Sequence, residues 1–369
     1  MVKKKRILII DAPLGGGHKS ISDSIVDALQ KKSQNLEIIH EEIDVTRQQF
    51  LYQLSIKHFS RVYKAFYQAS NVIATPSQIT ELEAVTAYKQ TEEIVMKVKP
   101  DVMVSNLPAT SLTVPKIVKK HGLKSKCVVF VADPFNPHRS FFNPQADHIC
   151  VATTASYTIG RKFKIPSERL SITGHPIRAQ FYDDSKSKQE LRDKLRWSER
   201  LFTVLIGGSG EGGDKVEEIL KQINEKDLKR IQVVCMTGRN EKLYGNLVSN
   251  KDRYNFPLFP YKFVENPADL LHASDVVLAK AGPNILFEAI AAAKPFVPTH
   301  HMEQEAGNPD YIKASGVGLL KNRSYSFADI VADIQSDETL QEQLRHNINR
   351  VRTEHKDAAE KIARVVLRM

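Results

Sequence analysis

The chain has 369 residues, more than the roughly 250–300 at which single hydrophobic cores stop growing, so its length predicts two domains. Hydrophobic residues make up 41% and charged residues 26% of the chain, as in an ordinary globular protein, and no run of about 18 apolar residues could span a bilayer. The net charge of +10 leaves nucleic acid, an anionic membrane surface and a phosphorylated substrate open as partners.

The cysteines and the N-terminal residues bear on the cellular compartment. Cys127, Cys150 and Cys235 are odd in number, have no metal-site spacing and lie in or beside apolar runs. We expect them to be buried, reduced thiols. Residues 1–6 are basic, but the apolar run 7–10 is too short for a secretory signal. These features predict a cytoplasmic protein.

The first predicted unit is a strand, a glycine loop and a helix. Residues 6–11 read as a buried strand, and Pro-Leu-Gly-Gly-Gly-His at 13–18 as the turn after it. The following helix carries a core-facing stripe of Ile21, Ser24, Ile25, Ala28 and Leu29. The loop matches neither Gly-x-Gly-x-x-Gly nor a Walker motif, so it predicts no dinucleotide site or P-loop. Three glycines let backbone approach a ligand, and His18 is expected at the ligand-binding carboxyl edge of the sheet.

After a second strand at 36–39, the segment from Val45 to Thr80 has no acidic residue. Its aromatic and aliphatic residues recur at spacings of four and three, as on one helix face: Tyr52, Ile56, Phe59, Tyr63 and Phe66. Basic residues flank that face, namely Lys57, Arg61 and Lys64. Such a face predicts contact with an anionic membrane, with about 1 kcal/mol from each basic residue. The alternative is a surface helix that buries Phe59 and Phe66 in its own domain.

The rest of the first half continues the alternation. A helical pattern at 81–99, strands at 101–105 and 127–131, a polar loop at 106–110 and a helix at 114–120 are predicted. The second of these strands leads into a loop that contains Asp133, His138 and Phe141. Short strands are expected at 148–151 and 170–173. A charged, helix-forming stretch at 185–200 is the predicted hinge region.

The second half repeats the alternation of strand, turn and helix. A strand at 202–206 leads into the glycine-dense loop 207–213, and a strand at 231–236 leads into the turn 237–240. A further strand at 275–279 is followed by Gly282-Pro283-Asn284, which opens a helix carrying Glu288. A helix N-terminus is a seat for an anion such as a diphosphate, and Glu288 could accept hydrogen bonds from ribose hydroxyls. After a strand at 295–298, the polar residues Gln304, Glu305 and Asn308 are expected at the same sheet edge.

These motifs resemble GT-B glycosyltransferases of the type that includes monogalactosyldiacylglycerol synthases, processive diacylglycerol glucosyltransferases and MurG. The run Gln-Glu-Ala-Gly-Asn at 304–308 is most similar to the first of these. The resemblance implies an α/β fold of two Rossmann-like, doubly wound parallel-sheet domains that face across a cleft. It implies an acceptor and membrane-binding domain at 1–180 and a UDP-sugar domain at 181–349. A C-terminal helix at 350–368 is expected to pack back on the first domain.

The resemblance also implies roles for particular residues. His18 or Asp133 would be the catalytic base, while Gly16, Gly17, His138 and Phe141 would contact the acceptor. Lys57, Phe59, Arg61 and Lys64 would contact the membrane. The donor would be bound by Gly208, Ser209, Gly210, Arg239, Phe263, Val264, Gly282, Pro283, Asn284, Glu288, Gln304, Glu305 and Asn308. Some plant relatives carry an acidic residue just before the glycines, where this chain has Pro13-Leu14. The resemblance therefore assigns no catalytic base to this position.

The implied function is inverting transfer of a hexose from a UDP-sugar to a lipid alcohol, with diacylglycerol the foremost candidate, by a peripheral protein on the inner face of the cell membrane. No cofactor or essential metal is expected, since the chain has no Asp-x-Asp clamp. Nucleic acid would explain the charge but not the glycine loops. The alternatives are a MurG-like N-acetylglucosaminyltransferase, a UDP-N-acetylglucosamine 2-epimerase and a UDP-sugar sensor without turnover. Residue by residue, His18, Asp133 and Glu288 could also be helix caps or ordinary surface charges.

Overall fold

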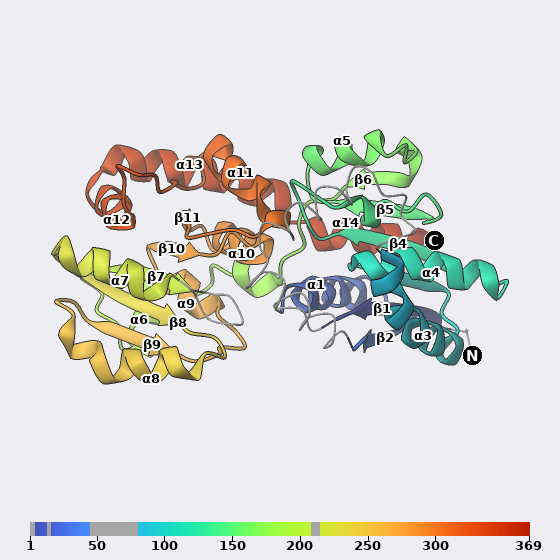
Figure 1. The fold of residues 1–369 in the computed structure, drawn as a ribbon, viewed down its shortest axis with the longest axis horizontal. Helices are drawn as coiled ribbons and strands as arrows, with labels where there is room; N and C mark the ends of the chain where they lie inside the picture. Colours follow the sequence, from blue (N-terminus) through green and yellow to red (C-terminus); the bar gives the residue numbers. More distant parts are fainter. Residues whose placement is uncertain (1–3, 13–15, 45–79, 208–214) are drawn as a thin grey trace. The chain divides into compact units, whose positions relative to one another are not determined.

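A computed structural model describes residues 4–12, 16–44, 80–207 and 215–369. The chain forms two compact units (Figure 1). Residues 1–176 with 357–369 make the first unit, and residues 177–356 make the second. Both units are parallel sheets covered by helices, as expected for two Rossmann-like domains, and we describe each by itself.

The first unit is built on a six-stranded sheet in the order β2-β1-β3-β4-β5-β6. All neighbouring strands pair in parallel. The strands are β1 (Lys5–Asp11), β2 (Leu36–Glu42), β3 (Val102–Ser105), β4 (Lys126–Val131), β5 (His148–Val151) and β6 (Leu170–Ile172). Its longer helices are α1 (Gly17–Lys32), α3 (Thr80–Val98), α4 (Pro108–Lys120), α5 (Thr154–Lys162) and α14 (Ala358–Arg368).

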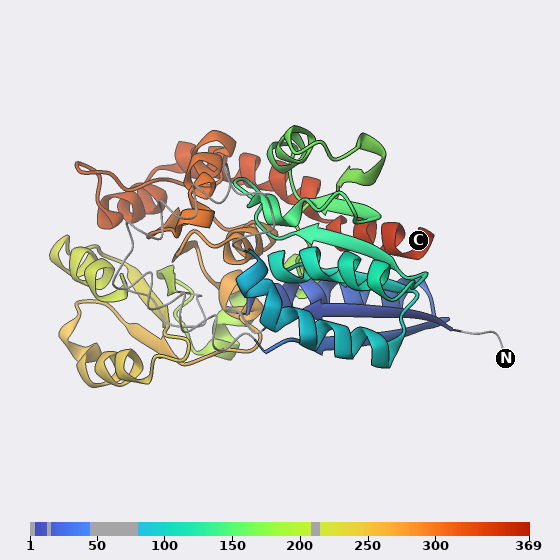
Figure 2. The ribbon, with the colours of Figure 1, turned by 45° about the vertical axis from the view of Figure 1, so that its right-hand side comes forward.

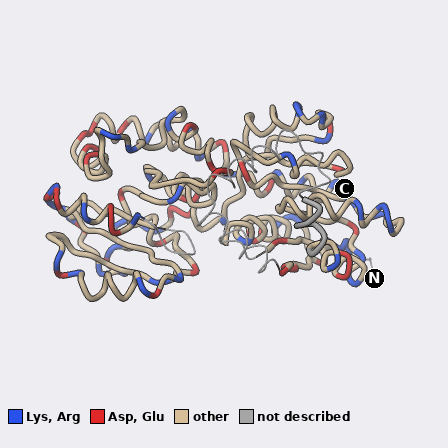
Figure 3. The backbone as a smooth tube through the Cα atoms, viewed as in Figure 1, with Lys and Arg blue, Asp and Glu red and all other residues tan. Residues whose placement is uncertain are grey.

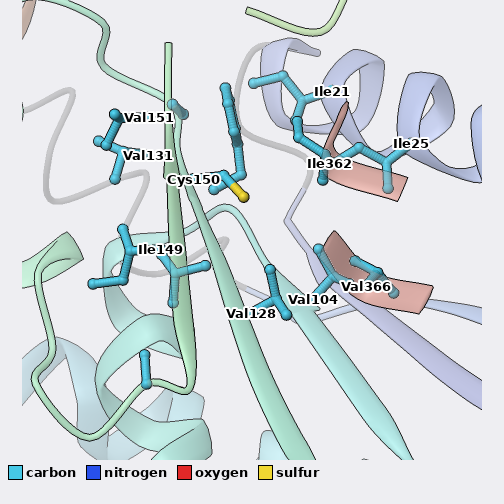
Figure 4. Close-up of a cluster of buried hydrophobic side chains, with 14 of the residues drawn as sticks. Ile21, Ile25, Val104, Val128, Val131, Ile149, Cys150, Val151, Ile362 and Val366 are labelled. Atoms are coloured by element: carbon cyan, nitrogen blue, oxygen red, sulfur yellow. The ribbon is translucent and has the colours of Figure 1, made fainter. Parts of the chain in front are cut away.

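Side chains alternate across β1, and this alternation builds two cores. Ile7 and Ile9 belong to a core with residues of α1 and α14, whereas Leu8 and Ile10 belong to one with residues of α3 and α4. Figures 1 and 2 show these helix pairs on the two faces of the sheet. Figure 4 shows the first core, where Ile21 and Ile25 of α1 meet α14.

The second unit has a five-stranded sheet in the order β11-β10-β7-β8-β9, again paired in parallel. The strands are β7 (Phe202–Gly207), β8 (Ile231–Met236), β9 (Leu258–Tyr261), β10 (Val276–Ala279) and β11 (Phe296–Pro298). The helices are α6 (Lys188–Leu195), α7 (Val216–Glu225), α8 (Glu241–Asn250), α9 (Ala268–Ala273), α10 (Pro283–Ala291), α11 (Gly307–Ser315), α12 (Phe327–Ser336) and α13 (Glu338–His355). Figure 3 shows acidic and basic residues interspersed along both units, and on α13 they form ion pairs such as Arg350–Glu354 at 3.1 Å.

Two sequence predictions were wrong in their boundaries. The predicted polar loop at 106–110 is partly helix, because α4 begins at Pro108 in the first turn, where proline lacks only an N–H that would be unpaired there. The predicted single helix 350–368 is divided between α13 and α14 at Lys356–Asp357. Their buried residues belong to different units: α13 packs on α10 and α12, while α14 packs on α1.

In the described part of the chain, no helix is both long and apolar enough to traverse a bilayer.

Candidate active site

His18 lies at the carboxyl edge of the first sheet, where the sequence predicted it. Strand β1 ends at Asp11, and α1 begins at Gly17 after a left-handed Gly16 with φ of 83°. That left-handed backbone conformation favours glycine, because residues with a Cβ rarely adopt it. His18 is therefore in the first turn of α1, at the edge where open parallel sheets bind ligands.

The backbone around His18 is held by Asn106, which follows β3. The Asn106 Nδ2 donates to the His18 carbonyl oxygen at 2.9 Å and to Ser22 Oγ at 3.1 Å. The His18 Nδ1 is buried and has no partner among the described residues. Burial lowers the pKa of His18, although the negative charge of Asp11 and hydrogen bonding with Asn106 act in the opposite direction. His18 is thus a neutral imidazole at pH 7, the form that can accept a proton.

A buried carboxylate beside His18 was not among the predicted site residues. Asp11 is 0% exposed, and its Oδ2 lies 2.8 Å from Nε2 of His40 on β2. That hydrogen bond raises the pKa of His40. The only sequence signal is that Asp11 ends an apolar strand beside the glycine loop, while its pairing with His40 requires the register of β1 and β2.

The loop after β4 holds the other predicted acceptor-side residues, and they differ in exposure. Asp133 is partly exposed just beyond the strand. His138 caps the short 3-10 helix η1 (Arg139–Phe141), accepting from the Ser140 N–H and lying 2.7 Å from Ser140 Oγ. Burial and the neighbouring Arg139 lower the pKa of His138 to about 4. Phe141 is 1% exposed within the first core, where it anchors the loop, and its contact with the acceptor stays a prediction.

In the second unit, Glu288 lies on α10 behind the Gly282-Pro283 turn that ends β10. It is 7% exposed and its Oε1 lies 3.5 Å from an Arg178 guanidinium nitrogen. Arg178 also stacks over the Phe181 ring at 5.2 Å, and its Nε is buried without a partner among the described residues. The ion pair keeps the carboxylate oriented, and it was not predicted from the sequence.

Glu305 and Asn308 brace the turn at Gly282. Glu305 Oε1 lies 2.8 Å from Lys280 Nζ, and Oε2 accepts from the Met302 N–H at 2.9 Å. A Cβ added at Gly282 would stand 3.5 Å from Glu305 Oε1. Asn308, 1% exposed, donates from Nδ2 to the Ala281 carbonyl at 2.6 Å. The turn and the 304–308 run are thus brought together, and Lys280 is a cation at this edge that the prediction left out.

The loop after β9 carries an exposed aromatic ring, and the loop after β8 carries a cation that lies over it. Phe263 is 54% exposed, and the Arg239 guanidinium lies over its ring at 5.4 Å. Val264 beside it is partly exposed. Strand β7 lies between β10 and β8 and ends at Gly207, where a Cβ would collide with the Met236 carbonyl. Strand β7 therefore ends between the strands that lead to the Gly282 turn and the Arg239 turn.

Some predicted residues are outside the described part of the chain: Gly208, Ser209, Gly210, Lys57, Phe59, Arg61 and Lys64. In the ranges that the structure covers, no three His, Cys, Asp or Glu side chains are grouped so as to hold a metal ion.

Comparison with known families gives one match in each unit. The sequence model of the family described as monogalactosyldiacylglycerol (MGDG) synthase matches residues 18–177. The model of the glycosyltransferase family 28 C-terminal domain matches residues 203–365. Each unit therefore matches a glycosyltransferase family domain, and each is built on a parallel sheet.

Among such enzymes it resembles the synthases of glycosyl diacylglycerols. Monogalactosyldiacylglycerol synthase 1 of Arabidopsis thaliana is 26% identical over 348 residues, covering 90% of this chain and 65% of the relative. The chain thus spans about two thirds of the length of that relative. A processive diacylglycerol beta-glucosyltransferase of Bacillus cereus is 26% identical over 352 residues, covering 91% and 87% of the two chains.

Solved structures show the same fold. MurG of Acinetobacter baumannii superposes with a TM-score of 0.63 at 12% identity, covering 99% of this chain and 100% of MurG. A UDP-GlcNAc 2-epimerase from Neisseria meningitidis bound to UDP-GlcNAc gives 0.66 at 13% identity, with the same coverage. At these identities the likeness concerns the fold alone.

Proposed function

We propose that this protein transfers a hexose from a UDP-hexose to diacylglycerol, with inversion at the anomeric carbon. The observation that carries the proposal is the pair of family matches. The first begins at His18 and takes in strands β2 to β6 of the first sheet, and the second takes in the second sheet from Thr203 onward. The relatives named for monogalactosyldiacylglycerol synthesis and diacylglycerol glucosylation align along about nine tenths of the chain. The residue arrangement at each sheet edge supports the corresponding half of the reaction.

The second unit has groups suited to a UDP-hexose. The N-terminus of α10 and the Lys280 ammonium offer positive charge to a diphosphate. The exposed Phe263 ring, with Arg239 beside it, offers a surface on which a uracil ring can stack. The Arg178-oriented Glu288 would accept hydrogen bonds from ribose hydroxyls. The fold neighbour that holds UDP-GlcNAc is consistent with such a donor.

The first unit has a group suited to proton transfer. An alcohol is a weak nucleophile at neutral pH, so a positioned base that takes its proton contributes roughly 10²–10⁴-fold in rate. His18 is our candidate, because its lowered pKa keeps it neutral at pH 7. Asp133 at the same sheet edge is the alternative base. The acceptor oxygen forms its bond to the anomeric carbon as the bond to UDP breaks, and the proton moves to the base.

We propose that no metal ion or other cofactor takes part in the reaction. The negative charge that develops on the departing diphosphate would be stabilised by backbone N–H groups in the first turn of α10 and by Lys280, which Glu305 fixes in place at 2.8 Å. Gln304 and Glu305, beside that turn, would contact the sugar and select among hexoses.

The segment 45–80 would place the protein on an anionic membrane at the cytoplasmic face. Replacing Lys57, Arg61 and Lys64 by glutamine should weaken binding to phosphatidylglycerol vesicles about 100-fold, at about 1 kcal/mol for each residue. Vesicle sedimentation measures this, with Lys242, Lys251 and Lys262 of the second unit replaced as a control of equal charge. Equal sedimentation of the two variants would exclude this segment as the membrane contact.

A panel of UDP-sugars incubated with diacylglycerol vesicles, with lipid products identified by mass, tests the proposal. We expect one hexosyl-diacylglycerol to form with an equal amount of UDP. A product only from a lipid-linked muropeptide would support a MurG-like enzyme, and conversion of UDP-N-acetylglucosamine to its 2-epimer would support an epimerase. Binding of a UDP-sugar without formation of any product would support the alternative of a UDP-sugar sensor without turnover.

A further inference from the structure

A methionine lies among the polar groups at the carboxyl edge of the second sheet. Met302 follows β11 and directly precedes the short 3-10 helix η5 (Glu303–Glu305). Its Sδ lies 3.4 Å from Lys280 Nζ and 3.7 Å from Gln304 Nε2. Its backbone N–H donates to Glu305 Oε2 at 2.9 Å. Met302 therefore contacts three of the residues to which the proposed function assigns a part in binding the donor.

The Met302 sulfur helps to orient the Lys280 ammonium. A lysine ammonium has three N–H groups, and a thioether sulfur is a weak acceptor. The ion pair with Glu305 at 2.8 Å and the contact with the sulfur occupy two directions around Lys280 Nζ. The third direction is left for a phosphate oxygen of the donor. Because the sulfur accepts only weakly, it competes little with that phosphate for the ammonium.

Met302 is also a sulfur that an oxidant can reach. It is partly exposed, whereas Met103 and Met236 are 1% and 5% exposed. The thiols compete poorly for an oxidant, because all three cysteines are buried and burial raises the pKa of each, which keeps the reactive thiolate scarce. Oxidation of a methionine turns an apolar thioether into a polar sulfoxide. At Met302, that change would occur within reach of a cation that the donor needs.

We propose that Met302 is an oxidation site, and that its conversion to the sulfoxide by a peroxide weakens binding of the UDP-hexose. The Sδ–O bond forms as the O–O bond of hydrogen peroxide breaks. The sulfur is oxidised by two electrons, and the peroxide is reduced to water, which takes both of its hydrogens. The sulfoxide oxygen then accepts a hydrogen bond from the Lys280 ammonium and competes with the donor phosphate. A methionine sulfoxide reductase reverses the step, releasing the oxygen as water while two thiols become a disulfide.

The other contacts of Met302 determine which properties change on oxidation. Gln304 Nε2 is a second donor that the sulfoxide oxygen can engage, since it lies 3.7 Å from the sulfur. The bond from the Met302 N–H to Glu305 Oε2 involves backbone and does not depend on the state of the sulfur. The oxidised protein should therefore stay folded, with its melting temperature close to that of the reduced protein, while its affinity for the donor falls.

The first test combines hydrogen peroxide with UDP as the probe. This inference rests on the donor half of the proposed function alone, so no lipid is needed. Peptide mass spectrometry should find Met302 oxidised in the free protein and protected by saturating UDP. Met96 on α3, which is also partly exposed, should be oxidised equally with and without UDP. We expect the Kd for UDP, from titration calorimetry, to rise about 10-fold on oxidation, and to recover after methionine sulfoxide reductase and dithiothreitol.

Two substitutions of Met302 separate the sulfur from the shape of the side chain. Met302→Leu keeps a similar volume without sulfur, so it should bind UDP about 2-fold more weakly than wild type and be insensitive to peroxide. Met302→Gln places a carbonyl oxygen at about the position of the sulfoxide oxygen, and should bind about 10-fold more weakly without any peroxide. Met96→Leu is the matched control and should keep both the wild-type Kd and its sensitivity to peroxide.

Three results would contradict these expectations, each at a different step. An unchanged Kd for UDP after complete oxidation of Met302 would overturn this inference, as would an equal loss of affinity in peroxide-treated Met302→Leu. Absence of UDP binding to the untreated wild type would refute the donor site itself and this inference with it. If UDP binds and protects Met302 but no lipid product forms, the proposed transfer fails while the oxidation site stands.

Discussion

The carboxyl edges of the two sheets are stabilised differently. At the edge of the second unit, each buried carboxylate faces a cation: Glu288 pairs with Arg178 at 3.5 Å and Glu305 with Lys280 at 2.8 Å. At the edge of the first unit, Asp11 has one oxygen bound and one unbound, and His18 Nδ1 is buried without a partner in the described residues.

The different side-chain pairing at the two sheet edges suits two different functions, donor binding and proton transfer. Ion pairs that fix a turn and its supporting side chains suit a site that binds a large donor in one geometry, because little reordering is then needed on binding. A neutral histidine beside a partly unpaired carboxylate suits a site where a proton must move. We therefore expect changes at the second edge to affect donor binding and stability, and changes at the first to affect turnover.

The largest expected effect comes from removing the base. His18→Ala should lower kcat by about 10²–10⁴-fold, because no other group would take the acceptor proton as readily. The melting temperature and the Kd for UDP should stay close to wild type, as measured by calorimetry and titration. His346→Ala, an exposed histidine on α13, is the control and should keep full activity. Wild-type turnover in His18→Ala would remove this residue from the reaction and leave Asp133 as the base.

At the second edge, Glu305→Ala should raise the KM for UDP-hexose and also destabilise the protein. It leaves the Lys280 ammonium and the Met302 N–H without their acceptor. We expect the free energy of unfolding to fall by about 1–3 kcal/mol in urea titrations. Asp310→Ala, an exposed acid on α11, should change neither quantity. If KM and stability are both unaffected in Glu305→Ala, the ion pair does not organise the turn.

Phe263→Ala should weaken donor binding without any cost in stability, because the ring is 54% exposed. Loss of one aromatic contact corresponds to about 0.5–1.5 kcal/mol, or roughly a 2- to 10-fold increase in the Kd for UDP by titration calorimetry. Val248 is another exposed apolar residue, at 41%. Val248→Ala therefore tests whether loss of any exposed apolar side chain changes the Kd for UDP. The stacking role is excluded if both variants bind UDP equally well.

The smallest effect concerns stability and pH. Because Asp11 raises the pKa of His40 above its unfolded value, this pair stabilises the fold fully below the unfolded pKa of about 6.5 and loses that contribution as pH rises through the folded pKa. His40→Gln should therefore lower the free energy of unfolding, measured by urea titration, more at pH 6 than at pH 9, by roughly 1 kcal/mol at the lower pH. An equal loss at both pH values would mean that the His40 charge does not contribute.

The alternation of strands and helices was predictable, because buried parallel strands read as short apolar runs. Strand β9 was missed, since Leu-Phe-Pro-Tyr at 258–261 contains a proline. The structure accounts for it: β9 is at the edge of its sheet, where proline is tolerated.

The site was predictable only where its residues are close to a turn in sequence. His18, Gly282 and Glu305 are at the sheet edges that the motifs indicated. The side-chain pairs near these edges, Asp11 with His40 and Arg178 with Glu288, join residues far apart in the chain. Such pairs depend on strand register and helix packing, which apolar patterns do not specify. The burial of Phe141 was not predictable for a related reason, because an aromatic residue in a polar loop can still be anchored in the core.

The proposed reaction depends on direct displacement at the anomeric carbon with His18 as the base. One NMR experiment tests it, in which UDP-hexose and diacylglycerol vesicles are followed with wild type and His18→Ala. We predict that wild type forms UDP and a hexosyl-diacylglycerol in equal amounts, with anomeric configuration opposite to the donor, and that His18→Ala forms almost none. A product that retains the donor configuration, or UDP release without a lipid glycoside, would contradict it.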